Sequence, residues 1–203
     1  MKKPLIIIAG ATGVGKTELS IDLAKLSGGS IISADSMQVY RGFNIGTAKI
    51  RPEETDGIKH YLIDELEADQ DFNIYEFKTR AVRYMEEIYN EGRIPMIVGG
   101  TGFYIQSVLY DVEFEKESPD KKYRSLLEEA AKKDGGAGNY RLLKEKDPDA
   151  ASSIHPNNIK RVIRALEFYH ETGEPISRHN EEQSSRESPY NFAYFVLNRE
   201  RNT

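Results

Sequence analysis

The chain has 203 residues, of which 38% are hydrophobic and 30% are charged, and its formal net charge is −5. This composition is typical of one globular domain, or of one domain with an insertion, and the acidic balance argues against an extended nucleic-acid-binding surface but not against a local basic groove. The absence of cysteine excludes a disulfide framework and a zinc site with Cys ligands, and it fits a cytoplasmic location. No apolar run approaches the ~20 residues of a membrane span, so we expect no membrane partner.

A glycine-rich motif near the N-terminus carries the strongest local signal. Residues 10–17, GATGVGKT, fit the pattern G-x-x-x-x-G-K-[ST]. Residues 5–9 before them are an apolar, β-branched run that predicts a buried strand, and residues 17–26 carry leucines at helical spacing. This order of strand, loop and helix predicts a phosphate-binding loop rather than a chance glycine turn. Lys16 would then reach the terminal phosphates, and the Thr17 hydroxyl would bind Mg²⁺.

Strand and helix patterns continue to alternate through the first half of the chain. Strands are predicted at residues 30–33, 60–64 and 95–98, and helices at residues 73–90 and 103–110. Asn73 is predicted to be the N-cap of the first of these helices. This alternation predicts an α/β fold with a parallel sheet of the P-loop NTPase type and helices on both faces.

The pattern changes near residue 112. We expect a P-loop core over residues 1–112, a helical insertion domain over residues 113–189, and a return to the core over residues 190–203, with a closing strand at 192–197. Four prolines are predicted to begin helices in the insertion: Pro119, Pro148, Pro156 and Pro175. Residues 134–138 are predicted to be a flexible break, and residues 156–172 a long helix. The chain stops abruptly after the closing strand, so we expect a C-terminal part beyond Thr203.

Candidate ligands of a substrate gather where the predicted strands end. Asp35 follows the second strand, and Gly99, Gly100 and Thr101 follow the strand at 95–98. Ligands of open parallel sheets bind beyond the carboxyl ends of the strands. Asp35 is therefore a candidate general base or Mg²⁺ ligand, although a turn cap also explains it. Thr101 is a candidate substrate contact, although a helix N-cap is the alternative explanation.

The predicted insertion carries one concentrated basic group. Lys160, Arg161 and Arg164 lie at helical spacing in an otherwise acidic chain, which favours an anionic ligand; a solvated helix face with Glu167 as ion-pair partner is the alternative. The four histidines show no spacing typical of a metal site.

Six motifs, taken together, resemble the tRNA dimethylallyltransferase family, in particular its bacterial members. They are GATGVGKT at residues 10–17, ISADSMQVYR at 32–41, NIGTAK at 44–49, HYLID at 60–64, VGGTGFY at 98–104 and HPNNIKRVIRALE at 155–167. The sequence departs from the family pattern at Asn158, where aspartate is usual, and at Tyr61, where a second histidine is usual.

This resemblance implies transfer of a dimethylallyl group from its diphosphate to N6 of the adenosine that follows a tRNA anticodon. It implies Asp35, Thr101 and Lys16 as catalytic residues, with Asp35 as the general base. It implies a diphosphate site made by Gly10, Ala11, Thr12, Gly13, Val14, Gly15, Lys16, Thr17 and Arg201, with Mg²⁺ bound by Thr17. The implied tRNA contacts are Asp35, Ser36, Met37, Gln38, Thr101, Arg124, Ile159, Lys160, Arg161, Val162, Ile163 and Arg164. The expected partners are tRNA and dimethylallyl diphosphate, bound by a monomer.

Two other functional classes remain open on the residues alone. A nucleoside or small-molecule kinase would use the same loop for ATP, Asp35 to activate a hydroxyl, and the insertion as a lid. A nucleotide switch or RNA-binding module without catalytic activity is the second alternative, and the position of Asp35 so near the phosphate loop argues against it. The strand at 95–98 ends without the acidic residue that many P-loop NTPases use for Mg²⁺, which weakens an ATPase interpretation.

Overall fold

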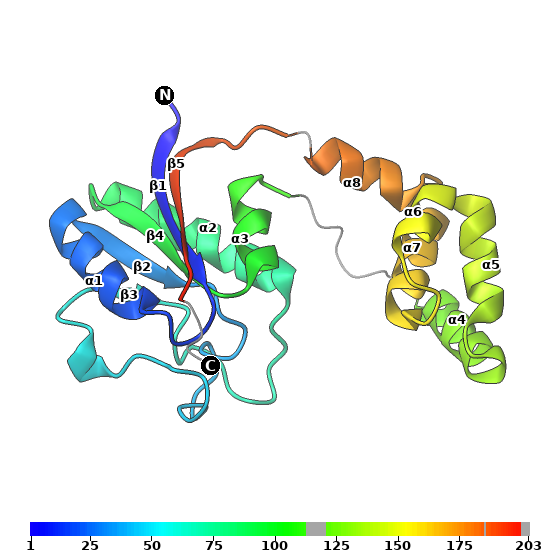
Figure 1. Ribbon diagram of the computed structural model, residues 1–203, viewed down its shortest axis with the longest axis horizontal. Helices are drawn as coiled ribbons and strands as arrows, with labels where there is room; N and C mark the ends of the chain where they lie inside the picture. The colour runs from blue at the N-terminus through cyan, green and yellow to red at the C-terminus, as the bar shows by residue number, and fades with distance from the viewer. Residues whose placement is uncertain (113–120, 185, 200–203) are drawn as a thin grey trace. The chain divides into compact units, whose positions relative to one another are not determined.

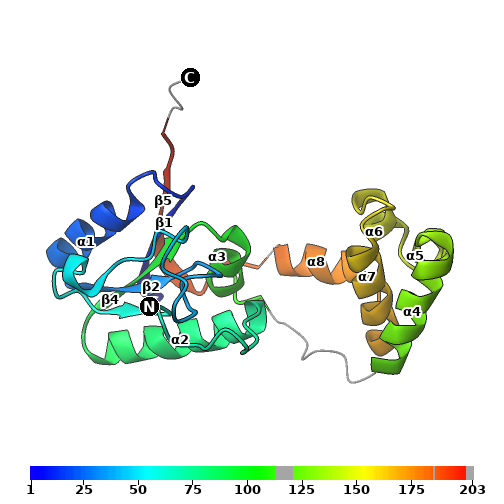
Figure 2. The same cartoon turned by 90° about the horizontal axis from the view of Figure 1, so that it is seen from below.

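The computed structural model describes residues 1–112, 121–184 and 186–199. The chain divides into two compact units, Met1–Val112 with Glu187–Thr203, and Glu113–Arg186. Figures 1 and 2 show both units from two directions, with the sheet in the first and only helices in the described part of the second. None of the helices in the described residues is long and apolar enough to cross a membrane.

The first unit is built on a five-stranded parallel sheet in the order β3-β2-β4-β1-β5. The strands are β1 (Lys3–Gly10), β2 (Gly29–Ser33), β3 (His60–Tyr61), β4 (Ile94–Gly99) and β5 (Tyr190–Leu197). The predicted α/β fold with a parallel sheet is thus confirmed. Because β2, β4 and β1 are neighbours, the three predicted strand-end segments come to one edge of the sheet.

Helices cover both faces of this sheet (Figure 2). On one face, helix α1 (Lys16–Ser27) packs Ile21 and Ala24 against alternate residues of the strands. On the other face, α2 (Ile74–Asn90) and α3 (Gly102–Leu109) enclose the larger core, in which Phe77 and Tyr104 stack with ring centroids 4.4 Å apart. A 3₁₀ helix (Pro52–Glu54) lies in the long connection between β2 and β3.

The predicted helices of the first unit are present, but the buried side of one of them, α1, differs from the prediction. Asn73 caps α2 as predicted, since its side chain accepts a hydrogen bond from the Glu76 amide at 3.0 Å. In α1, however, Leu26 of the predicted apolar face is exposed, and Ile21 and Ala24 are buried instead. The N-terminus of α1 is fixed by the phosphate loop, and this sets which side of the helix faces the sheet.

The second unit contains α4 (Lys121–Asp134), α5 (Ala137–Lys146), α6 (Pro148–Ser153), α7 (Ile159–Thr172) and α8 (Ile176–Ser184). They share a separate apolar core that includes Leu127, Leu143 and Leu166. Asp147, which is buried, links two of them: it caps α6 at the Ala150 amide and accepts two hydrogen bonds from Ser177 at the start of α8.

Two details of the predicted insertion are wrong. The long helix starts at Ile159 and not at Pro156, because the Asn158 side chain accepts from the Arg161 amide at 3.4 Å and acts as its N-cap. The break after α4 is a turn of only two glycines, shorter than the predicted residues 134–138. There the Asp134 carboxylate accepts from the Gly136 and Gly138 amides, the latter already within α5. Pro148 begins α6 and Pro175 directly precedes α8 as expected, whereas Pro119 lies outside the described residues.

Candidate active site

A cavity of about 350 Å³ opens at the carboxyl ends of β1, β2 and β4. Its walls come from the phosphate loop, from the segment after β2, and from the end of β4. The lining residues are Thr12, Gly13, Gly15, Lys16, Thr17, Glu18, Asp35, Gln38, Thr47, Ala48, Val98 and Gly99. The structure therefore brings the predicted phosphate ligands and the predicted base to one cavity.

The phosphate loop has a backbone shape that depends on glycine. Gly15, the N-cap of α1, has a φ of 93°, which side chains strongly disfavour. At Gly10, a Cβ atom would lie 2.5 Å from the carbonyl oxygen of Leu197 on the neighbouring strand β5. Gly15 places the turn directly before the N-terminus of α1, whose unpaired amides and positive dipole end attract anions.

Lys16 lies folded over the loop. Its ammonium group donates hydrogen bonds to the carbonyl oxygens of Gly10, at 2.9 Å, and Ala11, at 2.7 Å. Partial burial lowers the pKa of Lys16, and the nearby Asp35 carboxylate opposes this shift. The loop carbonyls carry only partial negative charge, so they do not neutralise the ammonium group. A bound diphosphate would neutralise it, and Lys16 is therefore suited to bind a phosphate group.

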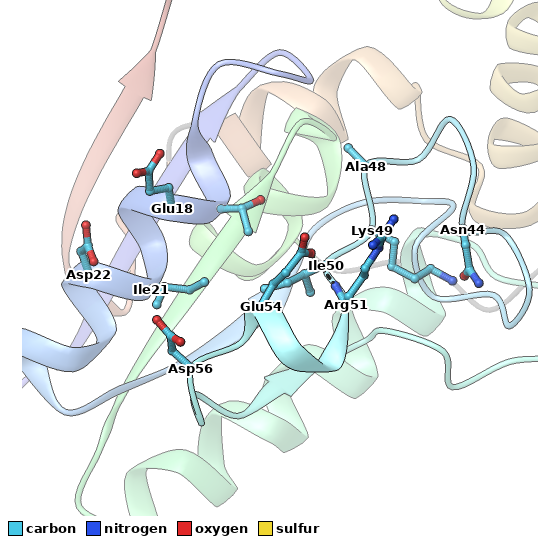
Figure 3. Close-up of a pocket in the computed structure, with 11 residues that line it drawn as sticks. Glu18, Ile21, Asp22, Asn44, Ala48, Lys49, Ile50, Arg51, Glu54 and Asp56 are labelled. Carbon is cyan, nitrogen blue, oxygen red and sulfur yellow. Dashed lines mark hydrogen bonds between the residues drawn. The ribbon is translucent and has the colours of Figure 1, made fainter.

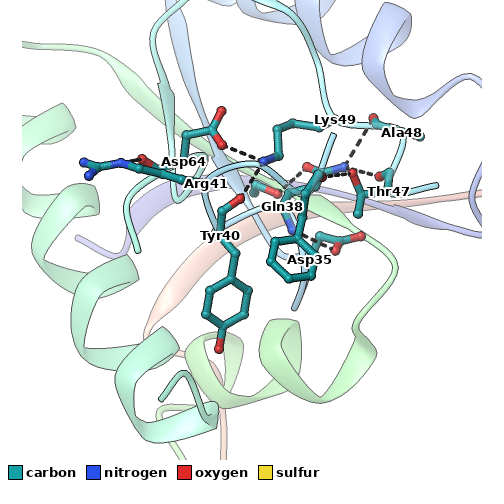
Figure 4. A network of polar contacts seen from close by, with 10 residues as sticks. Asp35, Gln38, Tyr40, Arg41, Thr47, Ala48, Lys49 and Asp64 are labelled. Atoms are coloured by element: carbon teal, nitrogen blue, oxygen red, sulfur yellow. Dashed lines mark hydrogen bonds and ion pairs between the residues drawn. The ribbon is translucent and has the colours of Figure 1, made fainter. Parts of the chain in front are cut away.

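Asp35 lies in the turn after β2 (Figure 4) and lines the same cavity as the phosphate loop. Its Oδ1 atom accepts hydrogen bonds from the backbone amides of Met37, at 2.9 Å, and Gln38, at 3.3 Å. The turn-capping interpretation is therefore correct. It does not exclude a catalytic role, because both bonds fall on one oxygen and no described residue donates to Oδ2 of Asp35.

Of the three residues that follow Asp35, two are exposed to solvent, and the side chain of the third is hydrogen-bonded to the protein. Ser36 and Met37 are exposed next to the cavity. The amide group of Gln38 is bonded at both ends, since its Nε2 donates to the Thr47 and Ala48 carbonyls and its Oε1 accepts from Ser33. As a result Gln38 forms part of the cavity wall, while its predicted contact with adenine would require it to exchange these bonds.

Close backbone packing after β4 determines which side chains can stand there. A Cβ atom at Gly99 would overlap the backbone of Ala34, so no acidic residue can occupy this position without a shift of the chain. Thr101 lies beside the Asp35 turn, because its amide donates to the Ala34 carbonyl at 3.2 Å. It is the N-cap of α3, yet its side chain makes no capping hydrogen bond, and the hydroxyl remains available to a substrate.

A second, larger hollow of about 700 Å³ lies between α1 and the segment of residues 44–56. Four carboxylates line it, from Glu18, Asp22, Glu54 and Asp56 (Figure 3). Lys49, which also lines it, is paired with Asp64, and Arg51 is the other cation of its wall. The larger hollow is not lined by Lys16 or by the phosphate-loop glycines, and its carboxylates disfavour a diphosphate, so the smaller cavity is the better candidate despite its size.

The predicted Mg²⁺ ligand Thr17 lines the smaller cavity together with Asp35. A hydroxyl and a carboxylate are hard oxygen donors of the kind that Mg²⁺ accepts, usually together with water and substrate phosphates. In the described part of the chain, no three His, Cys, Asp or Glu side chains cluster as a metal site. These residues therefore fit an ion that is held mainly by a bound diphosphate. Arg201, the last predicted diphosphate ligand, lies outside the described residues.

The predicted tRNA segment in α7 is partly exposed and partly buried. Lys160 and Arg161 are exposed, whereas Val162 and Ile163 are buried in the core of the second unit, so their side chains are not open to an RNA in this structure. Ile159 is partly buried against the same core. The reason is helical geometry, because five consecutive residues of a helix point in all directions around its axis.

Two of the arginines predicted to contact tRNA, Arg124 and Arg164, lie near the carboxylate of Glu167. The sequence predicted Glu167 to be an ion-pair partner on the helix surface, but it is buried. The Glu167 side chain is 1% exposed, and the guanidinium of Arg124 lies 3.4 Å from it. Burial raises the pKa of Glu167, while the charges of Arg124 and Arg164 lower it. Arg124 thus pairs with Glu167 within this unit, while its half-exposed side chain leaves its tRNA contact a prediction, as it is for Arg164. Glu167 follows Ile163 by four residues on the apolar side of α7, a spacing from which its burial could have been predicted.

The comparisons with known proteins agree on one family. The IPP transferase family matches residues 38–203. This chain belongs to the IPP transferase family. A tRNA dimethylallyltransferase of Lachnoclostridium phytofermentans is 59% identical over 98% of the chain, and one of Bacillus subtilis is 47% identical over 100% of it. In both cases the chain spans 64% of the length of the relative.

Solved structures of this family show the same fold. A eukaryotic dimethylallyltransferase, described as acting on tRNA, has a TM-score of 0.85 and 36% identity, over 96% of this chain and 48% of that one. A tRNA isopentenylpyrophosphate transferase of Staphylococcus epidermidis has a TM-score of 0.59 and 45% identity, over 96% and 63% of the two chains.

Proposed function

We propose that the complete protein transfers a dimethylallyl group from dimethylallyl diphosphate to N6 of the adenosine that follows a tRNA anticodon, and that it does so in the cytoplasm as a monomer. The observation that carries the proposal is that the phosphate loop and Asp35 line the same cavity. Family membership and the names of the relatives support it. The helical unit, with Lys160 and Arg161 exposed, would contribute tRNA contacts.

In this proposal the phosphate loop binds the leaving group. The C1–O bond of an allylic diphosphate can stretch with positive charge spread over carbon, so the barrier depends on how well the departing diphosphate is stabilised. The loop amides and Lys16 point hydrogen-bond donors at that group before the reaction begins. A Mg²⁺ ion held by Thr17 and the diphosphate would neutralise further negative charge.

Asp35 would act on the nucleophile. An exocyclic amino group of adenine is a poor nucleophile, and it loses a proton as the new N–C bond forms. The free Oδ2 of Asp35 is suited to accept that proton, while Oδ1 keeps the carboxylate in place through two backbone amides. The Thr101 hydroxyl is proposed to contact the same nucleotide. The adenine would have to leave its stack to reach the cavity, as bases do in enzymes that modify them.

The alternative kinase function is disfavoured by the end of β4. A P-loop enzyme that uses ATP commonly holds its Mg²⁺ with an acidic residue after this strand. Here Gly99 occupies that position, and the backbone of Ala34 leaves no room for a side chain. We therefore expect dimethylallyl diphosphate to bind more tightly than ATP.

Calorimetric titration of the complete protein with each ligand, in the presence of Mg²⁺, tests this expectation. Dimethylallyl diphosphate and inorganic pyrophosphate are expected to bind, since both offer the group that the loop recognises, and ATP is expected to bind more weakly. ATP affinity equal to or greater than that of the prenyl donor would favour the kinase.

The basic part of α7 gives a second prediction. Exchanging both Lys160 and Arg161 for alanine is expected to lower tRNA affinity and to flatten its dependence on salt, by about 0.7–0.9 units of slope for each tRNA phosphate that is no longer neutralised. Affinity for dimethylallyl diphosphate is expected to stay the same. Salt titrations of tRNA binding measure the slope, with Arg178→Ala as the control, because Arg178 is an exposed arginine of the same unit. A slope that does not change in the double variant would place the RNA-binding surface elsewhere.

A further inference from the structure

Lys49 is a buried cation beside the candidate active site (Figure 4). Its side chain is 3% exposed. The ammonium group donates to the carbonyl oxygen of Tyr40 and to Oδ1 of Asp64, both at 2.6 Å. Asp64 is itself tied to the same segment, because its amide donates to the Gln38 carbonyl at 3.1 Å and its own carbonyl accepts from the Arg41 side chain. Lys49 thus connects the end of one loop to its beginning and to the residues after β3.

Gln38 closes the same loop from the other side. Its Nε2 atom donates to the carbonyl oxygens of Thr47, at 3.0 Å, and Ala48, at 3.3 Å. Its Oε1 atom accepts from the Ser33 hydroxyl at the end of β2. Residues 41–48 are therefore held at both ends by side chains, in a compact loop that we call the 41–48 loop.

The backbone of the 41–48 loop is strained where it meets the cavity. Ala48 has a φ of 48°, a left-handed conformation that is unfavourable for a residue with a Cβ atom. Thr47 and Ala48 line the cavity together with Lys16 and Asp35. Such strain persists only where neighbouring contacts impose it, and it is commonly found at functional sites.

We infer that Lys49 is a positioning residue for the transfer reaction: with Gln38 it holds Thr47 and Ala48 as a fixed wall of the cavity that the phosphate loop also lines. This inference rests on the proposed function. A fixed wall keeps the prenyl donor and the incoming amino group in a reactive geometry, and a displacement of about 1 Å at such a wall can lower a rate by ~10²-fold. Lys49 acts through the 41–48 loop and does not line the smaller cavity itself.

The chemistry of Lys49 suits this task better than a purely stabilising one. A buried ammonium is costly to desolvate, and apolar residues of similar size often replace buried ion pairs without loss of stability. Replacement of Lys49 by methionine leaves no buried carboxylate, because the Asp64 side chain is 46% exposed and can be hydrated. The Lys49→Met protein is therefore expected to fold.

The test compares Lys49→Met with the parent protein in two independent measurements. We expect kcat for prenyl transfer to fall at least ~10-fold, as a displaced cavity wall would cause, with the Kd for dimethylallyl diphosphate changed by less than about 3-fold because the phosphate loop is untouched. We also expect chymotrypsin to cleave faster after Phe43, an exposed residue of the 41–48 loop. Lys25→Met, which breaks an exposed ion pair with Asp56, is the control and is expected to change neither quantity.

A second pair of variants removes the same contact from its more exposed partner. Asp64→Asn keeps an oxygen that can accept from Lys49 and is expected to retain most of the rate, whereas Asp64→Ala is expected to behave like Lys49→Met. Normal kcat and normal cleavage in Lys49→Met would overturn the inference. The inference would also be overturned if Lys49→Met lost activity only because it failed to fold, while Asp64→Ala was fully active. If the parent protein transfers no prenyl group but cleavage after Phe43 still accelerates, the proposed function fails and the role of Lys49 in fixing the loop stands.

Discussion

Replacement of Asp35 by asparagine is expected to lower the single-turnover rate of prenyl transfer by ~10²–10⁴-fold, which is the range typical of a lost general base. Asparagine keeps an Oδ1 atom that can accept from the Met37 and Gln38 amides, so the turn after β2 is expected to keep its shape. What it loses is the carboxylate oxygen that would take the proton from N6. The reaction should therefore slow while both substrates still bind.

Rapid-quench measurements with excess protein, together with titrations of dimethylallyl diphosphate, separate the two effects. Asp35→Ala serves as the comparison, because it removes the capping bonds as well as the base and is expected to lower both the rate and the thermal stability. If Asp35→Asn reacts at nearly the parent rate with donor binding intact, Asp35 is a turn cap and another group accepts the proton.

Removal of the Lys16 ammonium is expected to weaken binding of dimethylallyl diphosphate by about 10–100-fold in Lys16→Ala, since a hydrogen bond to a charged group contributes roughly 1.5–3 kcal/mol. In the unliganded structure this ammonium donates to the carbonyls of Gly10 and Ala11. Because those carbonyls lie in an open loop that water can reach, the fold is expected to tolerate the change.

The matched control is Lys25→Ala, on the same helix. Lys25 forms an exposed ion pair with Asp56 and does not line the smaller cavity, so donor affinity is expected to stay within about 2-fold, as for most surface ion pairs. Titration of both variants with dimethylallyl diphosphate measures the two affinities. Equal affinities would mean that the loop amides alone bind the diphosphate.

Local signals explain which parts of this protein the sequence predicts well. The phosphate loop, the cap at Asn73 and the strand that precedes Asp35 each depend on residues adjacent in the chain, and the structure reproduces them. The convergence of the strand ends follows from the rule that parallel strands present their carboxyl ends at one edge. The fold class and the general position of the site could therefore be predicted from the sequence.

The contacts that the sequence did not predict join residues that are distant in the chain. The bond from Lys49 to Asp64 spans 15 residues, and the ion pair of Arg124 with Glu167 spans 43. Neither has a local pattern, so the sequence did not predict that the Arg124 guanidinium pairs with the buried carboxylate of Glu167. The tRNA contact that the family resemblance implies for Arg124 stays a prediction. The burial of Val162 was missed for another reason, because a contact segment implied as a continuous run does not take account of which side of the helix each residue occupies.

The proposed function depends above all on the identity of the group transferred and of its acceptor. Both are measured by incubating the complete protein with Mg²⁺, dimethylallyl diphosphate and a tRNA anticodon stem-loop, and then analysing the digested nucleosides by mass spectrometry. We predict that the adenosine after the anticodon exchanges one N6 proton for a dimethylallyl group, with one diphosphate released for each, and that a stem-loop with guanosine at that position stays unmodified. An unmodified adenosine under conditions in which the protein binds both substrates would contradict the proposed function.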